Sequence, residues 1–509
     1  NVALGADFSK QSVYINGDLD LTIPKIKLSG GVGVAYICDV SVYGQAENKV
    51  KWASGGDISA SLTGELGVSA KALCFSYEKA LLKGTWDYYK YSTSKSKTKN
   101  SVNTSRKSWG DNKAMSIKAD DTNATKWNSS SRTRTISSDN EVTLQKDIYD
   151  AAKPKLLKTD NGKTIITYIA AVNNRSEGNQ YAVVYSVYDE TTGKWSTPTV
   201  VVDDGTADFN LKTVANGNNI YFVWSNLKEK ITAKEIESLD SESVASKCEV
   251  EYAKLNTDTM KISGSSVITS NNNLDTIPDA YVNDGKVYVG WVENSNNDIL
   301  NLRGTNKIHL GEIDGNKYTE KQAKSVSNPI KQVSIGKLGD NVELAYIEKN
   351  NDENSLNTMD IYGKINNIKS MSGIIENATF SKIDNKDSLL WYSNENNINI
   401  INCLDSEKMS ISKLIEDNQV NSDFYIVNDG KRDILLSSAN EGSSNSQAIG
   451  YVIGQGNGYV ELLNSKNKIG NISAVYDDGK YTLLYTDTVA NVGENSVDTA
   501  TDLKIKSVK

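Results

Sequence analysis

Seven stretches of the chain share one pattern: a short apolar run, a tight turn rich in Gly, Asn or Asp, and a second apolar run. Two such runs joined by a turn of this composition predict a β-hairpin. The stretches begin at Lys153, Asp208, Ile277, Pro329, Asn377, Ser422 and Asn471. A hairpin repeated in this way restricts the fold to architectures that stack one β unit many times.

The second strands of these hairpins also share an aromatic position. An aromatic residue at one register of every unit predicts a repeated packing layer. The expected members are Tyr168, Trp224, Trp291, Tyr346, Tyr392 and Tyr485, and Ser437 interrupts the series in the sixth unit. The turns are centred on Gly162, Gly217, Gly285, Gly339, Asn385, Gly430 and Gly479, which gives a period of 45 to 68 residues.

Further strand-like runs follow the first six hairpins, so that each unit has four antiparallel strands, as in the blade of a β-propeller. The seventh unit has only one more run, "TDLKIKSVK", before the chain ends. We expect the isolated run "NEVTLQKD" (residues 140–147) to supply its fourth strand, because a closed ring has no exposed sheet edge. The sequence therefore predicts an all-β, seven-bladed propeller over residues 135–509.

This repeat region covers about three-quarters of the chain and resembles the propeller repeats of secreted and surface proteins of Gram-positive bacteria. The resemblance implies the fold and a secreted or cell-surface location, and it implies no particular activity. The chain also starts at Asn1 without Met, which suits a processed or excised form.

The first 91 residues do not share the period. Long runs such as "LDLTIPKIKLSGGVGVAYICDVSV" alternate small or apolar residues with polar ones, which predicts a separate domain of long antiparallel strands. Residues 92–134 are expected to form a linker or extended loop. Within them, Ser92–Ser108 holds nine Ser or Thr and five Lys or Arg in seventeen residues, a composition that cannot bury a core.

Charge and composition exclude several classes of function. The formal net charge of −8 argues against nucleic acid as a partner, because binding requires a basic surface. No apolar run approaches the roughly 20 residues that span a bilayer. The single histidine, His309, excludes a His-rich metal site, and its place in the alternating run "KIHLGEI" indicates a packed strand residue.

Four cysteines are present and none forms a Cys-x-x-Cys motif. Cys38 and Cys74 lie on the apolar side of alternating runs, so a disulfide between them and two buried free thiols are both compatible with the pattern. Cys248 and Cys403 belong to different repeats and are not expected to pair.

The sialidases are a propeller family whose turns carry the motif Ser-x-Asp-x-Gly-x-Thr-Trp. "SVYDETTGKWS" (Ser186–Ser196) is superficially similar, because Asp189, Gly193 and Trp195 are present, but the spacing differs. We interpret it as an ordinary turn between third and fourth strands. Sialidases also clamp the substrate carboxylate with three arginines. This chain has only Arg106, Arg132, Arg134, Arg175, Arg303 and Arg432, so sialidase activity is not expected.

Other catalytic or metal sites are not indicated. The chain has 64 acidic residues, so adjacent pairs such as Asp203–Asp204 are expected by composition alone. Such a pair is therefore no evidence for a general acid and a general base. No Asp-x-Asp-x-Asp-Gly calcium loop occurs. Asp and Gly are common in tight turns because they tolerate the backbone conformation of a turn, so structural calcium is an alternative that the sequence does not favour. The sequence assigns no catalytic residue and no cofactor.

One asymmetry points to function. The connections between second and third strands are the long, variable ones: 172–179, 226–247, 294–306, 349–357 and 488–499. The run "KEKITAKEIESL" in the second predicts a short helix. Loops gathered on one face of a rigid scaffold are where binding sites usually lie, and Arg175 and Arg303 are the candidate ligand-binding residues there. We expect a binding module for a glycan or a protein. The alternatives are a carbohydrate-active enzyme with a site in the propeller funnel and a structural segment of a larger surface protein.

Overall fold

The computed structural model describes residues 19–34, 38–52, 58–72, 75–91 and 141–508. Within the last range it leaves out residues 147, 150–152, 173–174, 177, 239–240, 300–303, 351–352, 442–444, 456–457, 478 and 493–496. The predicted linker, residues 92–134, lies outside the described residues. Among the residues described, no helix is long and apolar enough to cross a membrane.

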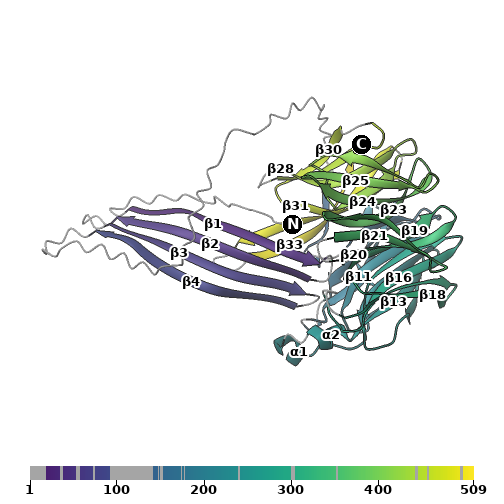
Figure 1. Ribbon diagram of the computed structural model, residues 1–509, viewed down its shortest axis with the longest axis horizontal. Coiled ribbons are helices and arrows are strands. Elements are labelled where there is room, and N and C mark those ends of the chain that lie inside the picture. The colour runs from purple at the N-terminus through teal and green to yellow at the C-terminus, as the bar shows by residue number, and fades with distance from the viewer. Residues whose placement is uncertain are drawn as a thin grey trace.

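The repeat region forms seven small antiparallel sheets, which are the seven predicted blades (Figure 1). In blade 1, β6 (Lys155–Lys158), β7 (Thr164–Ala171) and β8 (Tyr181–Asp189) are followed by a divided fourth strand, β9 (Lys194–Trp195) and β10 (Thr199–Val200). Blade 2 consists of β11 (Asp208–Asn216), β12 (Asn219–Leu227), β13 (Cys248–Asn256) and β14 (Lys261–Val267). Blade 3 consists of β15 (Leu274–Asn283), β16 (Lys286–Asn294), β17 (Asn306–Asp314) and β18 (Lys317–Val326).

The remaining blades follow the same order. Blade 4 consists of β19 (Ile330–Leu338), β20 (Asn341–Asn350), β21 (Glu353–Asp360) and β22 (Ile365–Met371). Blade 5 consists of β23 (Ile374–Ile383), β24 (Lys386–Glu395), β25 (Ile398–Asp405) and β26 (Ser410–Glu416). Blade 6 consists of β27 (Phe424–Asn428), β28 (Asp433–Glu441), β29 (Asn445–Val452) and β30 (Tyr459–Ser465).

Blade 7 closes the ring with strands from both ends of the repeat region. Its chain-terminal strands β31 (Lys468–Asp477), β32 (Lys480–Val492) and β33 (Val497–Val508) are completed by β5 (Glu141–Gln145), which pairs antiparallel with β33. The Tyr485 hydroxyl donates to Glu141 across this junction at 2.6 Å, and the Lys504 ammonium pairs with the same carboxylate. The predicted closure by the run before the first hairpin is confirmed.

The turns between first and second strands have the backbone that their sequences predict. All seven predicted turn residues have positive φ, from 59° at Gly217 to 81° at Gly162 and Gly430. Asn385 is the one non-glycine member, at 62°, and Asn is among the residues that tolerate this region.

The packing layer is present, with one change of membership. The six predicted aromatics are all buried. In the hairpin of blade 5, however, Thr379 pairs with Leu390, so the residue in register with Trp224, Trp291 and Tyr485 is Trp391. Tyr392 lies one residue later and therefore packs against blade 6, among Phe424 and Leu435. The prediction of Tyr392 was wrong by one position because the sequence there, "LLWYS", offers two adjacent aromatics.

The N-terminal region forms its own four-stranded antiparallel sheet, which pairs with no strand of the ring among the residues described. Its strands are β1 (Leu19–Val34), β2 (Cys38–Trp52), β3 (Ile58–Ala72) and β4 (Phe75–Tyr91), joined in sequence order. Long antiparallel strands were predicted here. Cys38 lies opposite Ala72, whereas Cys74 is outside the described residues, so the disulfide stays a prediction. Cys248 and Cys403 are both buried, and neither takes part in a disulfide.

Candidate functional site

The two faces of the ring differ in how their connections are built. We call the face that carries the connections between second and third strands the loop face, and the opposite face, with the turns between first and second strands, the turn face. Every first strand runs from the loop face to the turn face, since it ends in a first-to-second turn. First strands of neighbouring blades contact each other around most of the ring, and the strand order of each blade places them innermost.

The longest connection on the loop face, residues 228–247, folds into two short helices, α1 (Ala233–Ser238) and α2 (Ser241–Ala245), where one helix was predicted. A capping box fixes the start of α1, because the Thr232 amide donates to Glu235 while the Glu235 amide donates to the Thr232 hydroxyl. Ile231, Val244 and Ala245 are buried in one apolar cluster with Phe209. This insertion is therefore part of the folded body.

The neighbouring loop of blade 1 is bonded to this insertion. The side-chain amide of Asn179 donates to the Ile231 carbonyl and accepts from the Ile231 amide, both at 2.8 Å. Arg175 lies in the same loop, where its guanidinium donates to the carbonyls of Asn179 and Thr206 and pairs with Asp203. Its side chain is only 9% exposed, so the structure places this candidate residue as a brace between blades 1 and 2. Arg303 lies outside the described residues.

Two of the five predicted long loops are wrong. Between blade 4's second and third strands, β20 continues to Asn350 and β21 starts at Glu353, so residues 349–357 are mostly hairpin. Residues 488–499 likewise belong largely to the extended hairpin of β32 and β33. The polar, Asn-rich composition predicted loops in both places. In the structure the two strands of each hairpin continue to pair, and this pairing satisfies the backbone N–H and C=O groups whatever the side chains are.

A layer of polar side chains crosses the centre of the ring. In each blade, one first-strand residue pairs with the second-strand residue just before the position of the packing aromatic. We call these seven the central layer: Lys155, Lys212, Asp279, Ser334, Thr379, Tyr425 and Ser473. The Lys155 ammonium lies 4.3 Å from the centroid of the Tyr425 ring, which links blade 1 with blade 6 past blade 7. Lys212 and Asp279 form an ion pair.

A second layer lies two residues earlier along the chain in each blade, nearer the loop face. We call it the mouth layer: Lys153, Asn210, Ile277, Gln332, Asn377, Asp423 and Asn471. Six of the seven are polar, and all except Ile277 are at least partly solvent-exposed. Four have positive φ, Asn210, Ile277, Asn377 and Asn471, because the first strand has a β-bulge at this point.

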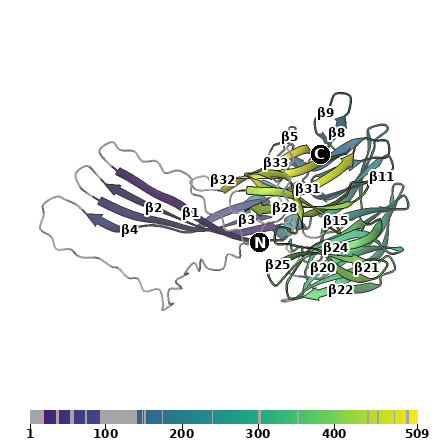
Figure 2. The same cartoon turned by 90° about the horizontal axis from the view of Figure 1, so that it is seen from above.

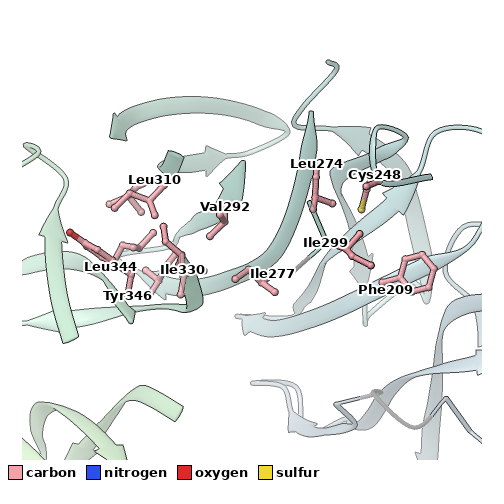
Figure 3. Packing of buried hydrophobic residues seen from close by; sticks show 14 of the residues in the cluster. Phe209, Cys248, Leu274, Ile277, Val292, Ile299, Leu310, Ile330, Leu344 and Tyr346 are labelled. Carbon is pink, nitrogen blue, oxygen red and sulfur yellow. The ribbon is translucent and has the colours of Figure 1, made fainter. Parts of the chain in front are cut away.

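Ile277 is the exception in chemistry. A β-branched residue at φ 45° is strained, and the other bulge residues with positive φ are all Asn. Its side chain is 8% exposed and belongs to the apolar cluster that also holds Ile330, Ile299 and Phe209 (Figure 3). The packing of its side chain against apolar residues of blades 2 to 4 stabilises this strained backbone.

Both layers also bond the blades to one another. The amide and carbonyl of Ala378 bond the Gln332 side chain, and the Asn377 side chain donates to the Ser422 carbonyl. Asp279 accepts from the Ile335 amide at 2.7 Å, and Asp423 accepts from the Asn471 amide at 2.5 Å. The first strands thus hold the ring rigid at the level where the polar side chains converge.

The charges of the two layers act on Lys153. This residue is exposed, yet protein from several blades surrounds its ammonium, and this desolvation lowers its pKa to about 7. The nearby charges of Lys212 and Lys155 lower the pKa further, while Asp279 and Asp423 oppose them. Burial raises the pKa of Asp423, against the opposing effects of its bond from Asn471 and the charge of Lys153. The arrangement supplies a partly charged amine and a carboxyl group at the mouth.

Outside this centre, the motif-like stretch Ser186–Ser196 forms the turn between β8 and β9, as predicted, and Figure 2 shows this hairpin projecting from the ring. Asp189 accepts from the Thr191 amide and the Thr192 hydroxyl, which lowers its pKa. His309 is buried and stacked on Trp291 at 4.6 Å, a packed strand residue as expected. Within the described part of the chain, no three His, Cys, Asp or Glu side chains are grouped to hold a metal ion.

Sequence reasoning missed the mouth and central layers. Their residues stand in the quoted hairpins, but the bulges change the spacing between first strand and turn from one blade to the next, so a plain alignment does not bring them into columns. The residue before the packing aromatic pairs with the central-layer residue of the first strand, and the mouth-layer residue lies two positions before that one. An alignment that starts from the packing aromatic would therefore have found both layers.

No protein-family model matches the chain, and no curated protein matches it. Solved structures with similar architecture include Trypanosoma rangeli sialidase with the inhibitor DANA (TM-score 0.41, 9% identity, covering 70% of this chain and 54% of the other). The same sialidase with 2,3-difluorosialic acid gives a TM-score of 0.42 at 10% identity, covering 74% and 56%. TolB from Acinetobacter baumannii gives 0.34 at 13% identity, covering 67% and 79%. The chain spans about half the length of the sialidase chains, and the similarity is weak and concerns the propeller fold alone.

Proposed function

We propose that this protein is a secreted or cell-surface binding module that takes a glycan or protein ligand at the loop face, around the mouth layer. The observation that carries the proposal is that the strand register places six polar, at least partly exposed residues from six blades at the loop-face end of the first strands. Binding sites are concave positions where a few polar groups are held by a rigid scaffold. The inter-blade bonds of Gln332, Asn377 and Asp423 supply that rigidity.

The test is a labelled preparation of the whole chain applied to an array of glycans and to an array of extracellular proteins. The proposal expects saturable binding to one ligand class that the same ligand, free in solution, inhibits. Absence of binding on both arrays would contradict it.

A second candidate is a carbohydrate-active enzyme with its site at the mouth. Lys153, whose pKa is lowered to about 7, could accept or release a proton near neutral pH, and burial raises the pKa of the Asp423 carboxyl group, which favours its protonated form. If this candidate holds, an array ligand incubated with the protein is cleaved, and Asp423→Asn abolishes cleavage while binding persists. An intact ligand after long incubation would leave binding as the function.

A further inference from the structure

The sheet of β1 to β4 has two faces of opposite chemistry. Residues that pair directly in an antiparallel ladder lie on the same face, so the register assigns each residue to one of the two. We call apolar the face that holds every second residue of β1 from Leu19 to Ile23 and from Ile26 to Val34, together with the residues of β2, β3 and β4 paired with them. Among the residues paired in this register, only Asn48 and Lys79 bring an amide or a charge to the apolar face.

The opposite face of the same strands, which we call the polar face, is rich in Ser, Thr, Lys and acidic residues. The row of paired residues through Lys27, for example, continues with Gln45, Glu65 and Lys83. Such a face is stable in water. The apolar face is continuous over four strands, whereas soluble monomers rarely expose apolar patches of more than a few hundred Å². It therefore requires a cover.

Little else in the sequence supplies that cover. Within the part of the chain that the structure describes, no element of the ring packs along the sheet, which Figures 1 and 2 show extending away from the ring. Residues 1–18, even fully extended, match the length of one strand. Residues 92–134 contain five apolar residues larger than Ala: Val102, Trp109, Met115, Ile117 and Trp127. These segments are too short or too polar to cover four strands of 15 to 17 residues.

The apolar face has the size of a stable interface between proteins. At a rise of about 3.3 Å per residue and a spacing of about 4.8 Å between strands, it measures about 50 by 19 Å, or about 1,000 Å². A standard interface buries about 800 Å² on each partner. A second copy of the same face supplies both the matching area and the matching chemistry, and two sheets pack face to face about 10 Å apart.

We propose that the apolar face packs against the apolar face of a second copy of this chain, with a two-fold axis that crosses the strands between the two sheets. This axis lays each strand over its own counterpart in the opposite direction. It places a central row of small residues over the neighbouring row, which has two leucines: Ala46, Gly64 and Gly84 over Gly44, Leu66 and Leu82. Small residues opposite large ones let two faces interdigitate. An axis along the strands would instead set Ala46 over Gly64 and leave a gap at the centre.

The same axis provides a partner for the charged residue of the apolar face. Lys79 lies on β4 one row beyond Leu82, and the axis brings this row over the row of Trp86 in the other copy. A lysine ammonium over an indole ring is attracted by the negative face of the ring. Because β4 is an edge strand, Lys79 lies at the rim of the interface, where a charge is tolerated.

A lipid surface is the other apolar phase that such a face could meet, and two features favour a second copy. Hydrocarbon chains adapt to any surface, so lipid contact does not require a row of small residues beside a row of leucines. A sheet within hydrocarbon must also pair both of its edges. Pro24, at the bulge in the edge strand β1, has no N–H to donate and opposes such pairing.

The experiment is sedimentation equilibrium of the whole chain over a range of concentrations, with substitutions at two neighbouring residues of β3. Val68 lies on the apolar face and Ser69 on the polar face. The unaltered chain and Ser69→Lys should sediment as dimers. Val68→Lys should raise the dissociation constant at least about a hundredfold, because it buries an unpaired charge in the interface. Far-ultraviolet circular dichroism and melting curves establish that each variant is folded.

A second pair of variants keeps the test independent of a folding defect, because both replace a charged residue of β4 by another. Lys79→Glu should raise the dissociation constant about tenfold, since a carboxylate is repelled by the face of Trp86. Lys90→Glu, on the polar face, should leave it unchanged. Lys79→Arg should also leave it unchanged, because a guanidinium keeps the attraction.

Three results would overturn the inference, and none of them bears on ligand binding by the ring. The first is an unaltered chain that stays monomeric at every concentration. The second is a dimer that Val68→Lys and Lys79→Glu weaken no more than their controls do. The third is a monomer that floats with phosphatidylcholine vesicles and loses this property in Val68→Lys but not in Ser69→Lys, which would identify lipid as the cover of the apolar face.

Discussion

Single residues repeat their roles from blade to blade in this protein. The packing aromatic of each second strand lies on the face toward the preceding blade: Trp291 packs with Val223 and Tyr221 of blade 2, and Trp391 packs with Ala345 and Ile347 of blade 4. Each such side chain fills space between its own sheet and the neighbouring one. Removing it should leave a cavity that the stiff ring cannot close.

The first prediction separates Trp391 from its neighbour Tyr392. Trp391→Ala should lower the free energy of unfolding by about 3–5 kcal/mol, because a fully buried indole leaves a cavity. Tyr392→Phe should cost only about 1 kcal/mol, because it removes one hydrogen bond, from the Tyr392 hydroxyl to Asn399. Urea denaturation of the two variants measures both values. Equal losses would contradict the assignment of Trp391 to the packing layer.

The second prediction concerns Asp275, which is fully buried and accepts a 2.9 Å hydrogen bond from the Trp291 indole. Burial, together with the charges of Glu249 and Glu293, raises its pKa to about 8. Since an aspartate in an unfolded chain has a pKa of about 3.9, the folded state holds the proton more tightly. Its contribution to stability is complete below about pH 4 and is lost as the pH rises toward 8.

Asp275→Asn keeps an acceptor for Trp291 and removes the ionisation. The difference between the unfolding free energies at about pH 5 and about pH 8 should therefore shrink in this variant. Urea denaturation at both pH values is the measurement, with the exposed Asp340→Asn as the control that leaves the difference unchanged. A difference unaltered by Asp275→Asn would mean that Asp275 ionises normally in the folded protein.

At the scale of elements, the ring depends on one short strand. β5 has five residues, and it is separated from its partner β33 by most of the chain. Its side chains nevertheless make specific contacts, since Glu141 accepts from Tyr485 and pairs with Lys504, which also pairs with Asp487. Without β5, the edge of β33 would be open to solvent and to other chains.

The third prediction tests this closure. Val142 and Ile505 are directly opposite in the β5–β33 ladder, so Val142→Cys combined with Ile505→Cys should form a disulfide. The bond closes a very long loop and should raise the free energy of unfolding of the oxidised form by roughly 2–4 kcal/mol over the reduced form.

Peptide mapping under non-reducing conditions identifies the bond. The matched control is Thr143→Cys with Ile505→Cys, because Thr143 and Ile505 point to opposite faces of the sheet. A bond that formed as readily in the control would contradict the register.

The sequence predicted the elements that depend on local signals. Turn residues with positive φ, such as Gly285 and Asn385, and the strand before the first hairpin were found from composition and periodicity alone. The site was not found, because its residues come from different blades and only the strand register of the whole ring brings them to the same level. The charge of Arg175 and its place in a loop predicted a ligand-binding residue, whereas the structure commits its guanidinium to Asn179, Thr206 and Asp203.

At the scale of the whole molecule, the ring presents two unlike faces. The turn face is made of short turns, while the loop face carries the insertion with α1 and α2 and surrounds the mouth layer. A rigid ring bonded at every blade junction changes little on binding, so the ligand should meet a preformed surface. The central claim is that this surface, and no other, takes the ligand.

Blocking each face in turn tests that claim most directly. Lys468→Cys places a thiol at the loop face near Asp423, and Lys163→Cys places one on the turn face, with the same loss of charge at another exposed site. Each variant is coupled to a polyethylene glycol maleimide, and its binding to the ligand identified on the arrays is measured before and after coupling. The account predicts that coupling at Lys468→Cys abolishes binding and that coupling at Lys163→Cys leaves it unchanged. Loss of binding only when the turn face is blocked would contradict it.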